Sequence, residues 1–517
     1  MIPYAKYPGL HPLFLDFLGG LPEFYPDPPS LDAAEQRGRE LLASAARARF
    51  PVSALRFRGD EAAGMAEELI EGRAVAVSAG HQVGLFTGPL YEIVKALDAI
   101  HLARALSRRG VPAVPVFWAL TDDHDLQEVA RTARPTEEGP QELVLAGADR
   151  QNRQPVGRLT IPPGISTIVE AFRPDAKAER ADAILDAFAR RSAPGIRYGD
   201  AFIERLLDLV EPDPLLVLDP LSDALRAPTG ALFLHAASKA DELRATLLDT
   251  ARKLEKAGKP VPAPVPEGFS FFAIDADGRK RIEDLNAAIA RLERGEIVPS
   301  ADVITRPVLK SYLFPMAVSV LGAAEIAYHA QSLPLFSLFD VPRPVLMPRT
   351  HVVLRGPVER RLAEYLGIPE EDLLMAATAE RPPAVPEAEA LEDRARTAQQ
   401  SLDELAPRLE RIDATLLGAL ETAKKKIAYQ FEQLADRANK AAQRRTDLVA
   451  GKRKRLQTLL APDGVPAERI YPPLSPMLAY GDEVRDALRR GVAETDPAAG
   501  AAVVDVGLAA TGGSNAG

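Results

Sequence analysis

The chain has no cysteine, a single tryptophan and few aromatic residues, which make up 6% of its 517 positions. The absence of cysteine excludes disulfides, thiolate metal sites and an enzyme-thiol nucleophile. No apolar run reaches the roughly 18 residues that would span a bilayer. The formal net charge of −10 argues against a general nucleic-acid coat, because phosphate binding depends on clustered Lys and Arg. We therefore expect neither membrane nor nucleic-acid partners.

Hydrophobic residues make up 46% of the chain, which is too much for a disordered protein. The length predicts about three or four domains. The first twenty residues contain one lysine and three prolines, without a basic region followed by an apolar run. We therefore expect no signal peptide and a cytoplasmic location.

One segment predicts a β–α–β unit. The apolar run from Arg73 to Gly80 is typical of a buried parallel strand. Residues 89–109 then carry apolar residues at helical spacing, and residues 111–120 form a second apolar run. Ligands of parallel sheets bind beyond the carboxyl ends of the strands, so the polar residues after both runs are candidates for a site.

The remaining N-terminal pattern predicts more strands and two inserted segments. Buried strands are expected at residues 215–220 and on both sides of a helix from Ala323 to Phe339. The segments QELVLAGAD and VGRLTIPPG predict one hairpin, and FSFFAIDADGRKRIE predicts a second with an Asp-Gly turn. The fold class is therefore α/β, with a doubly wound core.

Residues 387–461 follow a coiled-coil pattern, with apolar residues in alternating steps of three and four. Pro407 should interrupt it, so we expect two antiparallel helices with a break between Pro407 and Thr415. The second helix should run about 70 Å at about 1.5 Å per residue. Its basic clusters are typical of a solvated face, and a nucleic-acid arm is the alternative that lacks interleaved aromatics.

These patterns divide the chain into core, insertions and helical part. The expected boundaries are 1–135 for the N-terminal part of the core, 136–200 for the first insertion, 201–226 for a core strand and helix, 227–300 for the second insertion, 301–383 for the rest of the core, 384–463 for the coiled coil, 464–495 for a C-terminal return segment and 496–517 for a disordered tail.

The first candidate motif is SAGHQVGLFTGPLYEIVKAL, at residues 78–97. A glycine-bearing loop joins a strand to a helix, whose free N–H groups suit phosphate or carboxylate. The glycines would let the backbone approach a ligand, and two side chains would add hydrogen bonds. The residues concerned are Gly80, His81, Gly84, Thr87 and Gly88. The alternative is a tight β–α turn without a ligand.

The second motif is FWALTDDHDLQEV, at residues 117–129. Three Asp and one His within four positions are costly to bury without partners. Asp122, Asp123 or Asp125 could bind magnesium or orient an amine, and His124 could act as a base. The alternative is a helix N-terminus with a capping Asp and a solvated acidic face.

The third region contains TRPVLKSYLFP, AAEIAYHAQ and MPRT. Its three candidate anion-binding cations are Arg306, Lys310 and Arg349. Residues at steps of three lie on one helical face, so a second set could face one pocket. That set is Glu325, Tyr328 and Gln331. The alternative is ordinary ion pairing and packing, as it is for His329 and His351.

Taken in order, SAGHQVGLFTGPLYEIVKAL, PVFWALTDDHDLQEV, TRPVLKSYLFP, EIAYHAQ and PRT resemble the cysteine-adding family of bacillithiol biosynthesis (BshC), from near residue 1 to about 480. The resemblance implies a Rossmann-like core with two connecting-peptide insertions and a C-terminal antiparallel coiled coil that forms a homodimer. The core is also similar to class I synthetase folds. Ala323 and Ala324 depart from the glycine- or proline-containing turn expected before Glu325.

The resemblance further implies a ligase that forms a carbon–nitrogen bond between cysteine and glucosaminyl-malate, the last step of bacillithiol synthesis. ATP or a related nucleotide would activate the carboxylate, with Mg²⁺ left open. The catalytic candidates are His81, Asp122, Asp123, His124 and Asp125. The nucleotide-binding candidates are Gly80, Gly84, Thr87 and Gly88. The substrate-binding candidates are Gln82, Arg306, Lys310, Glu325, Tyr328, Gln331 and Arg349.

Two alternatives stay open at this point. One is a non-catalytic nucleotide-binding or scaffold protein of the same pathway, and the other is ligation of a different amino acid or sugar conjugate. Because the chain has no cysteine, a mechanism through an enzyme thioester is excluded in each case.

Overall fold

The structure is a computed structural model that describes residues 1–148, 153–375 and 386–507. The chain divides into two compact units. The core unit comprises residues 1–360, 369–374 and 458–517, and the helical unit comprises residues 361–368 and 375–457. Within the described ranges, no helix combines the length and apolarity needed to cross a membrane.

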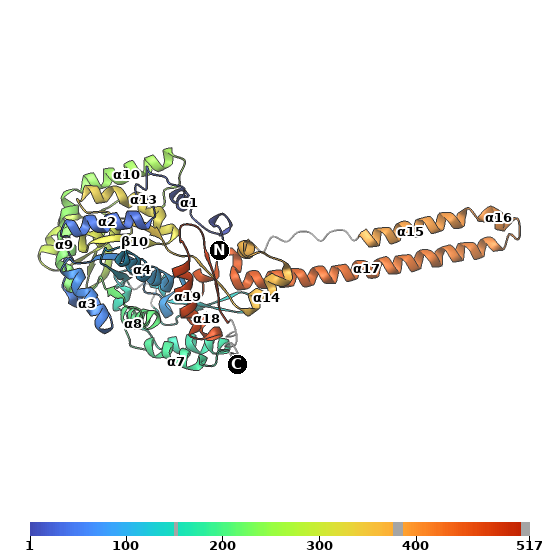
Figure 1. The fold of residues 1–517 in the computed structure, drawn as a ribbon, viewed down its shortest axis with the longest axis horizontal. Coiled ribbons are helices and arrows are strands. Elements are labelled where there is room, and N and C mark those ends of the chain that lie inside the picture. The colour runs from blue at the N-terminus through green and yellow to red at the C-terminus, as the bar shows by residue number, and fades with distance from the viewer. Residues whose placement is uncertain (149–152, 376–385, 508–517) are drawn as a thin grey trace, which may run out of the picture. The chain divides into compact units, whose positions relative to one another are not determined.

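A six-stranded sheet forms the centre of the core unit (Figure 1). The strand order is β1 (Leu55–Arg56), β6 (Leu216–Leu218), β3 (Ala113–Leu120), β2 (Val75–Gln82), β10 (Met316–Leu321) and β11 (Val345–Pro348). All neighbours are parallel except β1, which is an antiparallel edge strand. Residues 75–79 of β2 are fully buried, because helices cover both faces of the sheet.

The direction of the crossovers assigns the helices to the two faces. The chain moves from β2 to β3 through α4 (Tyr91–Arg108) and reaches β6 after α8 (Tyr198–Val210), which contacts α4. It moves the opposite way from β10 to β11 through α13 (Ala323–Leu338). Right-handed crossovers in opposite directions put α4 and α8 on one face and α13 on the other, as in a doubly wound fold.

The first inserted segment differs from the predicted hairpin. Strand β5 (Pro140–Val144) pairs with β4 (Arg131–Pro135) instead of with residues 156–164, so the predicted partner was wrong. The residues after β5 form α6 (Ile165–Phe172) and α7 (Ala181–Arg191). The true partner strand contains three polar residues and a proline, and sequence alternation alone did not mark it.

The second inserted segment contains the predicted hairpin. Strands β7 (Phe271–Asp275) and β8 (Gly278–Arg281) pair antiparallel around an Asp-Gly turn, and β9 (Val298–Ala301) adds a third strand. Helices α9 (Arg226–Ser238), α10 (Ala240–Lys256) and α11 (Leu285–Glu293) complete the segment. Helix α12 (Arg306–Leu313) follows β9 and leads back to the main sheet.

The C-terminal part of the core unit includes a strand that the sequence did not predict. Strand β13 (Ala502–Asp505) pairs parallel with β12 (Val352–Arg355), after α18 (Leu474–Tyr480) and α19 (Glu483–Glu494). The prediction of a disordered tail from residue 496 was therefore wrong for residues 502–505, and residues 508–517 lie outside the described ranges. Two half-buried ion pairs join Asp505 of β13 to Arg355 and Arg360.

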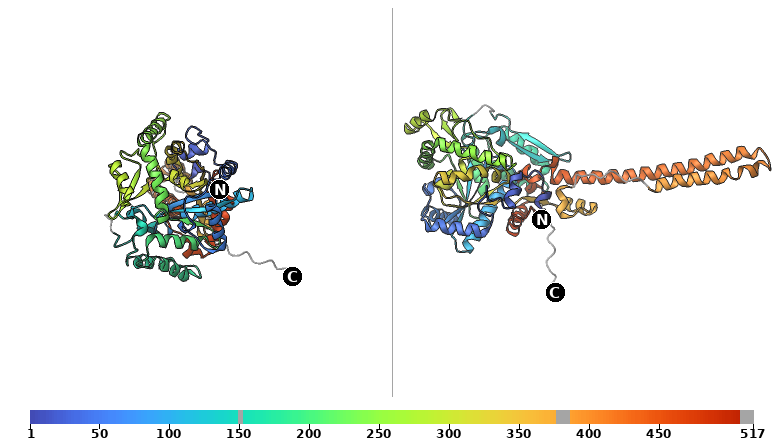
Figure 2. Two further views of the ribbon diagram at one scale, coloured as in Figure 1. Left: turned by 90° about the vertical axis from the view of Figure 1, so that its left-hand side faces the viewer. Right: turned by 90° about the horizontal axis from the view of Figure 1, so that it is seen from above.

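The helical unit is an antiparallel hairpin of long helices (Figure 2). Helix α15 (Pro386–Asp403) is followed by the short α16 (Ala406–Glu410) and by α17 (Leu416–Leu460), with the predicted break before Leu416. Lys424 of α17 forms an ion pair with Asp403 at the end of α15. Helix α17 has 45 residues, which correspond to about 68 Å at about 1.5 Å per residue.

Candidate functional site

The candidate site lies where the strand order of the main sheet changes direction. From β2 the chain proceeds to β3 and β6 on one side, whereas β10 and β11 lie on the other. The carboxyl ends of β2 and β10 therefore border a topological switch point, the usual place for a ligand in such sheets. His81 and Gln82 end β2, and Glu325 follows β10 in the first turn of α13.

A cavity of about 510 Å³ opens at this point, and we call it the site cavity. It collects eight of the predicted residues from motifs that are more than 200 positions apart. These are Gly80, His81, Gln82, Asp123, Arg306, Lys310, Glu325 and Tyr328. The sequence thus identified eight residues of the cavity wall. The roles proposed for these eight residues stay predictions.

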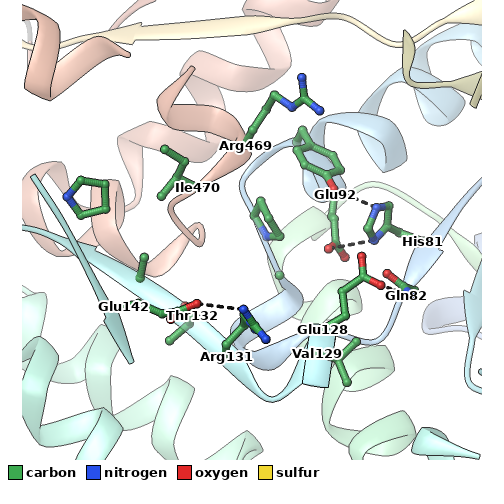
Figure 3. A pocket seen from close by; sticks show the side chains of 16 residues that line it. His81, Gln82, Glu92, Glu128, Val129, Arg131, Thr132, Glu142, Arg469 and Ile470 are labelled. Carbon is green, nitrogen blue, oxygen red and sulfur yellow. Dashed lines mark hydrogen bonds and ion pairs between the residues drawn. The ribbon is translucent and has the colours of Figure 1, made fainter. Parts of the chain in front are cut away.

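A second cavity of about 420 Å³ shares His81, Gln82 and Glu128 with the site cavity, and we call it the histidine cavity (Figure 3). Gly84 and Gly88 of the glycine loop and Arg469 of the C-terminal segment also line it. Gln82 Nε2 donates to Glu128 at 2.8 Å and to Asp123 at 3.1 Å. His81 therefore stands between two chambers.

His81 is held on both sides by residues of α4. Its Nδ1 lies 3.0 Å from Oε1 of Glu92, and its Nε2 lies 2.9 Å from the hydroxyl of Tyr91. Figure 3 shows the Glu92 carboxylate facing the imidazole. With a carboxylate at Nδ1, the proton belongs on that nitrogen, and Nε2 is left as the acceptor. Burial raises the pKa of Glu92 above its usual range, although His81 acts in the opposite direction.

The glycine loop accommodates Glu92. A Cβ placed on Gly88, whose φ is +68°, would collide with the carboxylate of Glu92. The backbone N–H of Leu90 donates to Tyr471, and that of Glu92 donates to Pro89. The first helical turn, where the sequence predicts a phosphate, thus already has a carboxylate of the protein beside it and two of its N–H groups engaged.

Lys95 connects the ends of the two central strands. It is buried, donates from Nζ to the carbonyl of Gly80 at 2.9 Å, and lies 2.5 Å from Oε2 of Glu325. The same oxygen of Glu325 accepts the backbone N–H of Gly322 at 2.6 Å. Burial raises the pKa of Glu325, but Lys95 and His81 outweigh it, and the pKa is lowered. Glu325 is therefore an anion fixed at the wall of the site cavity.

Asp123 is the only one of the three motif aspartates that lines the site cavity within the described residues. Burial raises its pKa, but the side chain of His124, the guanidinium of Arg279 and Arg306 outweigh this, and the pKa is held well below the usual range. Arg279 Nη1 donates to Asp123 at 3.2 Å and to Nδ1 of His124 at 3.0 Å. Nδ1 of His124 is engaged by a charged guanidinium and Nε2 of His81 by a neutral hydroxyl, so His81 is the more easily freed of the two candidate bases.

Two cations of the site cavity have no carboxylate partner within the described part of the chain, namely Arg306 and Lys310. The Nε of Arg306 is buried without any hydrogen-bond partner there. Burial lowers the pKa of Lys310 to about 7, although Glu325 acts against this. The acidic residues nearby are already engaged, so an anionic ligand is the missing partner.

Five other predicted residues are engaged away from the two cavities. Thr87 is buried and donates to the carbonyl of Phe86. Asp122 accepts from Ser300 inside the core, and Asp125 caps α5 (Leu126–Val129). Gln331 bonds both backbone groups of Ala263. Arg349 forms a buried bidentate pair with Glu468. The side chains of these five candidates therefore lie in the wall of neither cavity, and within a motif this follows because neighbouring residues point in different directions.

A magnesium ion would need oxygen ligands that converge on one point. Asp122, Asp123 and Asp125 do not converge, and no group of three His, Asp or Glu side chains in the described ranges could hold a metal ion. These residues therefore do not fit the Mg²⁺ ion that the sequence left open. Arg306 and Lys310 lack an anionic partner, which a carboxylate or phosphate group of a ligand would supply.

The sequence reading missed Glu92, Lys95 and Arg279. A usable signal existed for the first two, because apolar residues lie all round the N-terminal half of α4 and a charged residue there must be buried. A buried charge needs a partner, which marks it for attention. Arg279 lies in the hairpin of the second insertion, and nothing in the local pattern connects it to Asp123.

The fold and the site together define a class: a Rossmann-like α/β protein with a two-chambered polar site at the switch point and a C-terminal helical hairpin. Residues 30–350 match the family model described as bacillithiol biosynthesis BshC, N-terminal Rossmann-like domain. Residues 356–496 match the C-terminal coiled-coil domain of the same family. The chain belongs to the BshC family of bacillithiol biosynthesis.

Curated relatives agree over nearly full length. A protein of Koribacter versatilis is 28% identical over 94% of this chain and 96% of its own length. A protein of Salinibacter ruber is 30% identical over 84% of this chain and 83% of its own. Both are named "Putative cysteine ligase BshC". The family predicted from the sequence motifs is thus confirmed. The predicted Rossmann-like core and C-terminal coiled coil are confirmed as well.

Proposed function

We propose that this protein is a cysteine ligase that joins cysteine to glucosaminyl-malate through an amide bond, in the cytoplasm. The names of its relatives support the ligase class. The observation that carries the proposal is the position of His81 in the walls of both the histidine cavity and the site cavity. A side chain in this position can contact two substrates, one bound in each cavity.

The charges of the chambers suggest how the substrates are distributed. The histidine cavity has the carboxylates of Glu92 and Glu128 in its wall, which suit the ammonium group of cysteine. The site cavity has Arg306 and Lys310, which suit the carboxylates of the malate group. In this arrangement the carboxylate of cysteine and the amine of the sugar approach each other next to His81.

His81 is the proposed base. The attacking amine must lose a proton, and the Nε2 of His81 accepts it once the hydroxyl of Tyr91 has moved aside. Glu92 at Nδ1 holds the ring and stabilises the imidazolium that forms. Asp123, fixed by Gln82 and Arg279, orients the amine. A free carboxylate is unreactive toward amines, and a nucleotide such as ATP would supply its activation.

The helical unit supports a second part of the proposal, a homodimer. Helix α17 exposes large apolar residues at Tyr429, Leu434 and Leu448, which are 56%, 52% and 53% exposed. Exposed apolar residues along a coiled-coil helix are typical of a surface that pairs with another helix. We propose that a second copy of this chain covers them.

A ligation assay tests the proposal. Purified protein is incubated with cysteine, glucosaminyl-malate and ATP, and the product is identified by its mass. We expect bacillithiol, and a loss of at least about 100-fold in rate for His81→Ala, since a general base contributes about 10²–10⁴-fold. Product formation at the wild-type rate by a His81→Ala, Asp123→Ala double variant would contradict the site assignment.

A further inference from the structure

A third hollow adjoins the site cavity on the hairpin of the second insertion, and we call it the hairpin groove. It has a volume of about 660 Å³ and shares Phe272, Arg279 and Arg281 with the site cavity. Its other lining residues are His124, Arg153, Lys280 and Glu283. The groove thus continues the site cavity outward, and four cations face one carboxylate in its wall.

Two of these four cations already form ion pairs with carboxylates of the protein. Arg279 pairs with Asp123, and Lys280 lies 2.9 Å from Asp277. Arg153 and Arg281 have no hydrogen-bond or ion-pair partner for their side chains among the residues described by the structure. Both are exposed, so they are ready to bind a ligand without losing a protein contact.

The hairpin also places like charges side by side. Arg279 and Arg281 project from the same face of β8, and both guanidinium groups lie over the ring of Phe272, at 3.7 and 4.9 Å from its centroid. Stacking on an aromatic ring fixes the plane of a guanidinium and leaves its N–H edge free for an oxyanion. Adjacent cations repel each other, and a bound anion between them removes the repulsion.

We propose that Arg153 and Arg281 form an anion subsite for an oligophosphate, the phosphate chain of the nucleotide that activates the carboxylate. This inference rests on the proposed function for the role of the nucleotide, but not for the binding itself. Two carboxylates of malate are matched by Arg306 and Lys310 in the site cavity. The separate pair of guanidiniums at its outer end therefore serves a second, longer polyanion.

The test is calorimetric titration of the full-length protein with inorganic tripolyphosphate and, separately, with L-malate. We expect an Arg153→Ala, Arg281→Ala double variant to bind tripolyphosphate at least about tenfold more weakly, the change that a loss of about 1.4 kcal/mol produces. Malate binding should weaken by less than this, because Arg306 and Lys310 remain in the site cavity. Arg294→Ala, an exposed arginine of the same insertion outside the groove, is the matched control and should bind both ligands as the wild type does.

Two outcomes of the titration overturn the inference. Equal weakening for malate would assign the groove to the malate-bearing substrate, and unchanged tripolyphosphate affinity would show that the arginines bind no oligophosphate. The ligation assay distinguishes a failure of the anion subsite from a failure of the proposed function. A wild type that forms product while the double variant keeps its tripolyphosphate affinity refutes the subsite alone. Weakened tripolyphosphate binding without any ligation product would refute the ligase and leave the subsite.

Discussion

The buried ammonium group of Lys310 should lower the free energy of unfolding. We expect this cost because the charge has no partner until an anionic ligand binds. Its side chain is 8% exposed, and its ammonium has no ion-pair partner within the described residues. Glu325 attracts the charge, whereas Lys95 and Arg306 repel it. A pKa lowered from 10.5 to about 7 by burial corresponds to about 5 kcal/mol against the charged form.

This cost depends on pH in a defined way. Below pH 7, Lys310 is charged in the folded and the unfolded chain, and the full cost is present. Between pH 7 and 10.5 the folded chain releases the proton first, so stability rises with pH until the cost disappears. About 2 kcal/mol should remain at pH 9.

The Lys310→Met variant keeps the apolar stem and removes the charge, so it should be more stable than the wild type. For a unit of this size, we expect Tm to rise by about 5 °C at pH 6 and by about 2 °C at pH 9. Circular dichroism at both pH values measures this, with the exposed Lys256→Met as a control that should show no such pH-dependent gain. A variant that is less stable at pH 6, or a gain independent of pH, would refute the reasoning.

Three further predictions concern the site and the helical unit. Glu92→Gln should lower the ligation rate by about 10²–10⁴-fold, as measured by steady-state kinetics, because the imidazolium loses its carboxylate. Lys95→Met should destabilise the core unit by about 3–5 kcal/mol in a thermal melt, because Glu325 is left without its cation. Leu434→Asp with Leu448→Asp should convert a dimer into a monomer in light scattering without lowering the Tm of the core unit, and a wild-type monomer would refute the dimer.

The sequence sufficed for those parts of the fold whose signals are local. The β–α–β unit from residue 75 to residue 120 follows from apolar periodicity, and the hairpin at Gly278 follows from an Asp-Gly turn. Strand β13 pairs with β12 about 150 positions away, in a segment rich in alanine and glycine, and no local pattern marks it.

The site was predictable to a similar extent. The ends of β2 and β3 had to meet at one edge of the sheet, so His81 and Asp123 could be expected close together. The strand order, which brings Glu325 to the same edge, depends on long-range pairing that the sequence does not reveal. The direction of each side chain depends on the local turn, which sends Asp122 into the core and Asp123 into the cavity.

The proposed mechanism requires glucosaminyl-malate to bind in the site cavity with its amine at His81. A crystal structure of the protein with this compound would show where the compound binds. We predict that the malate carboxylates contact Arg306 and Lys310 and that the sugar amine lies within about 3 Å of the Nε2 of His81. A compound bound elsewhere, or bound with its amine directed away from His81, would contradict the account.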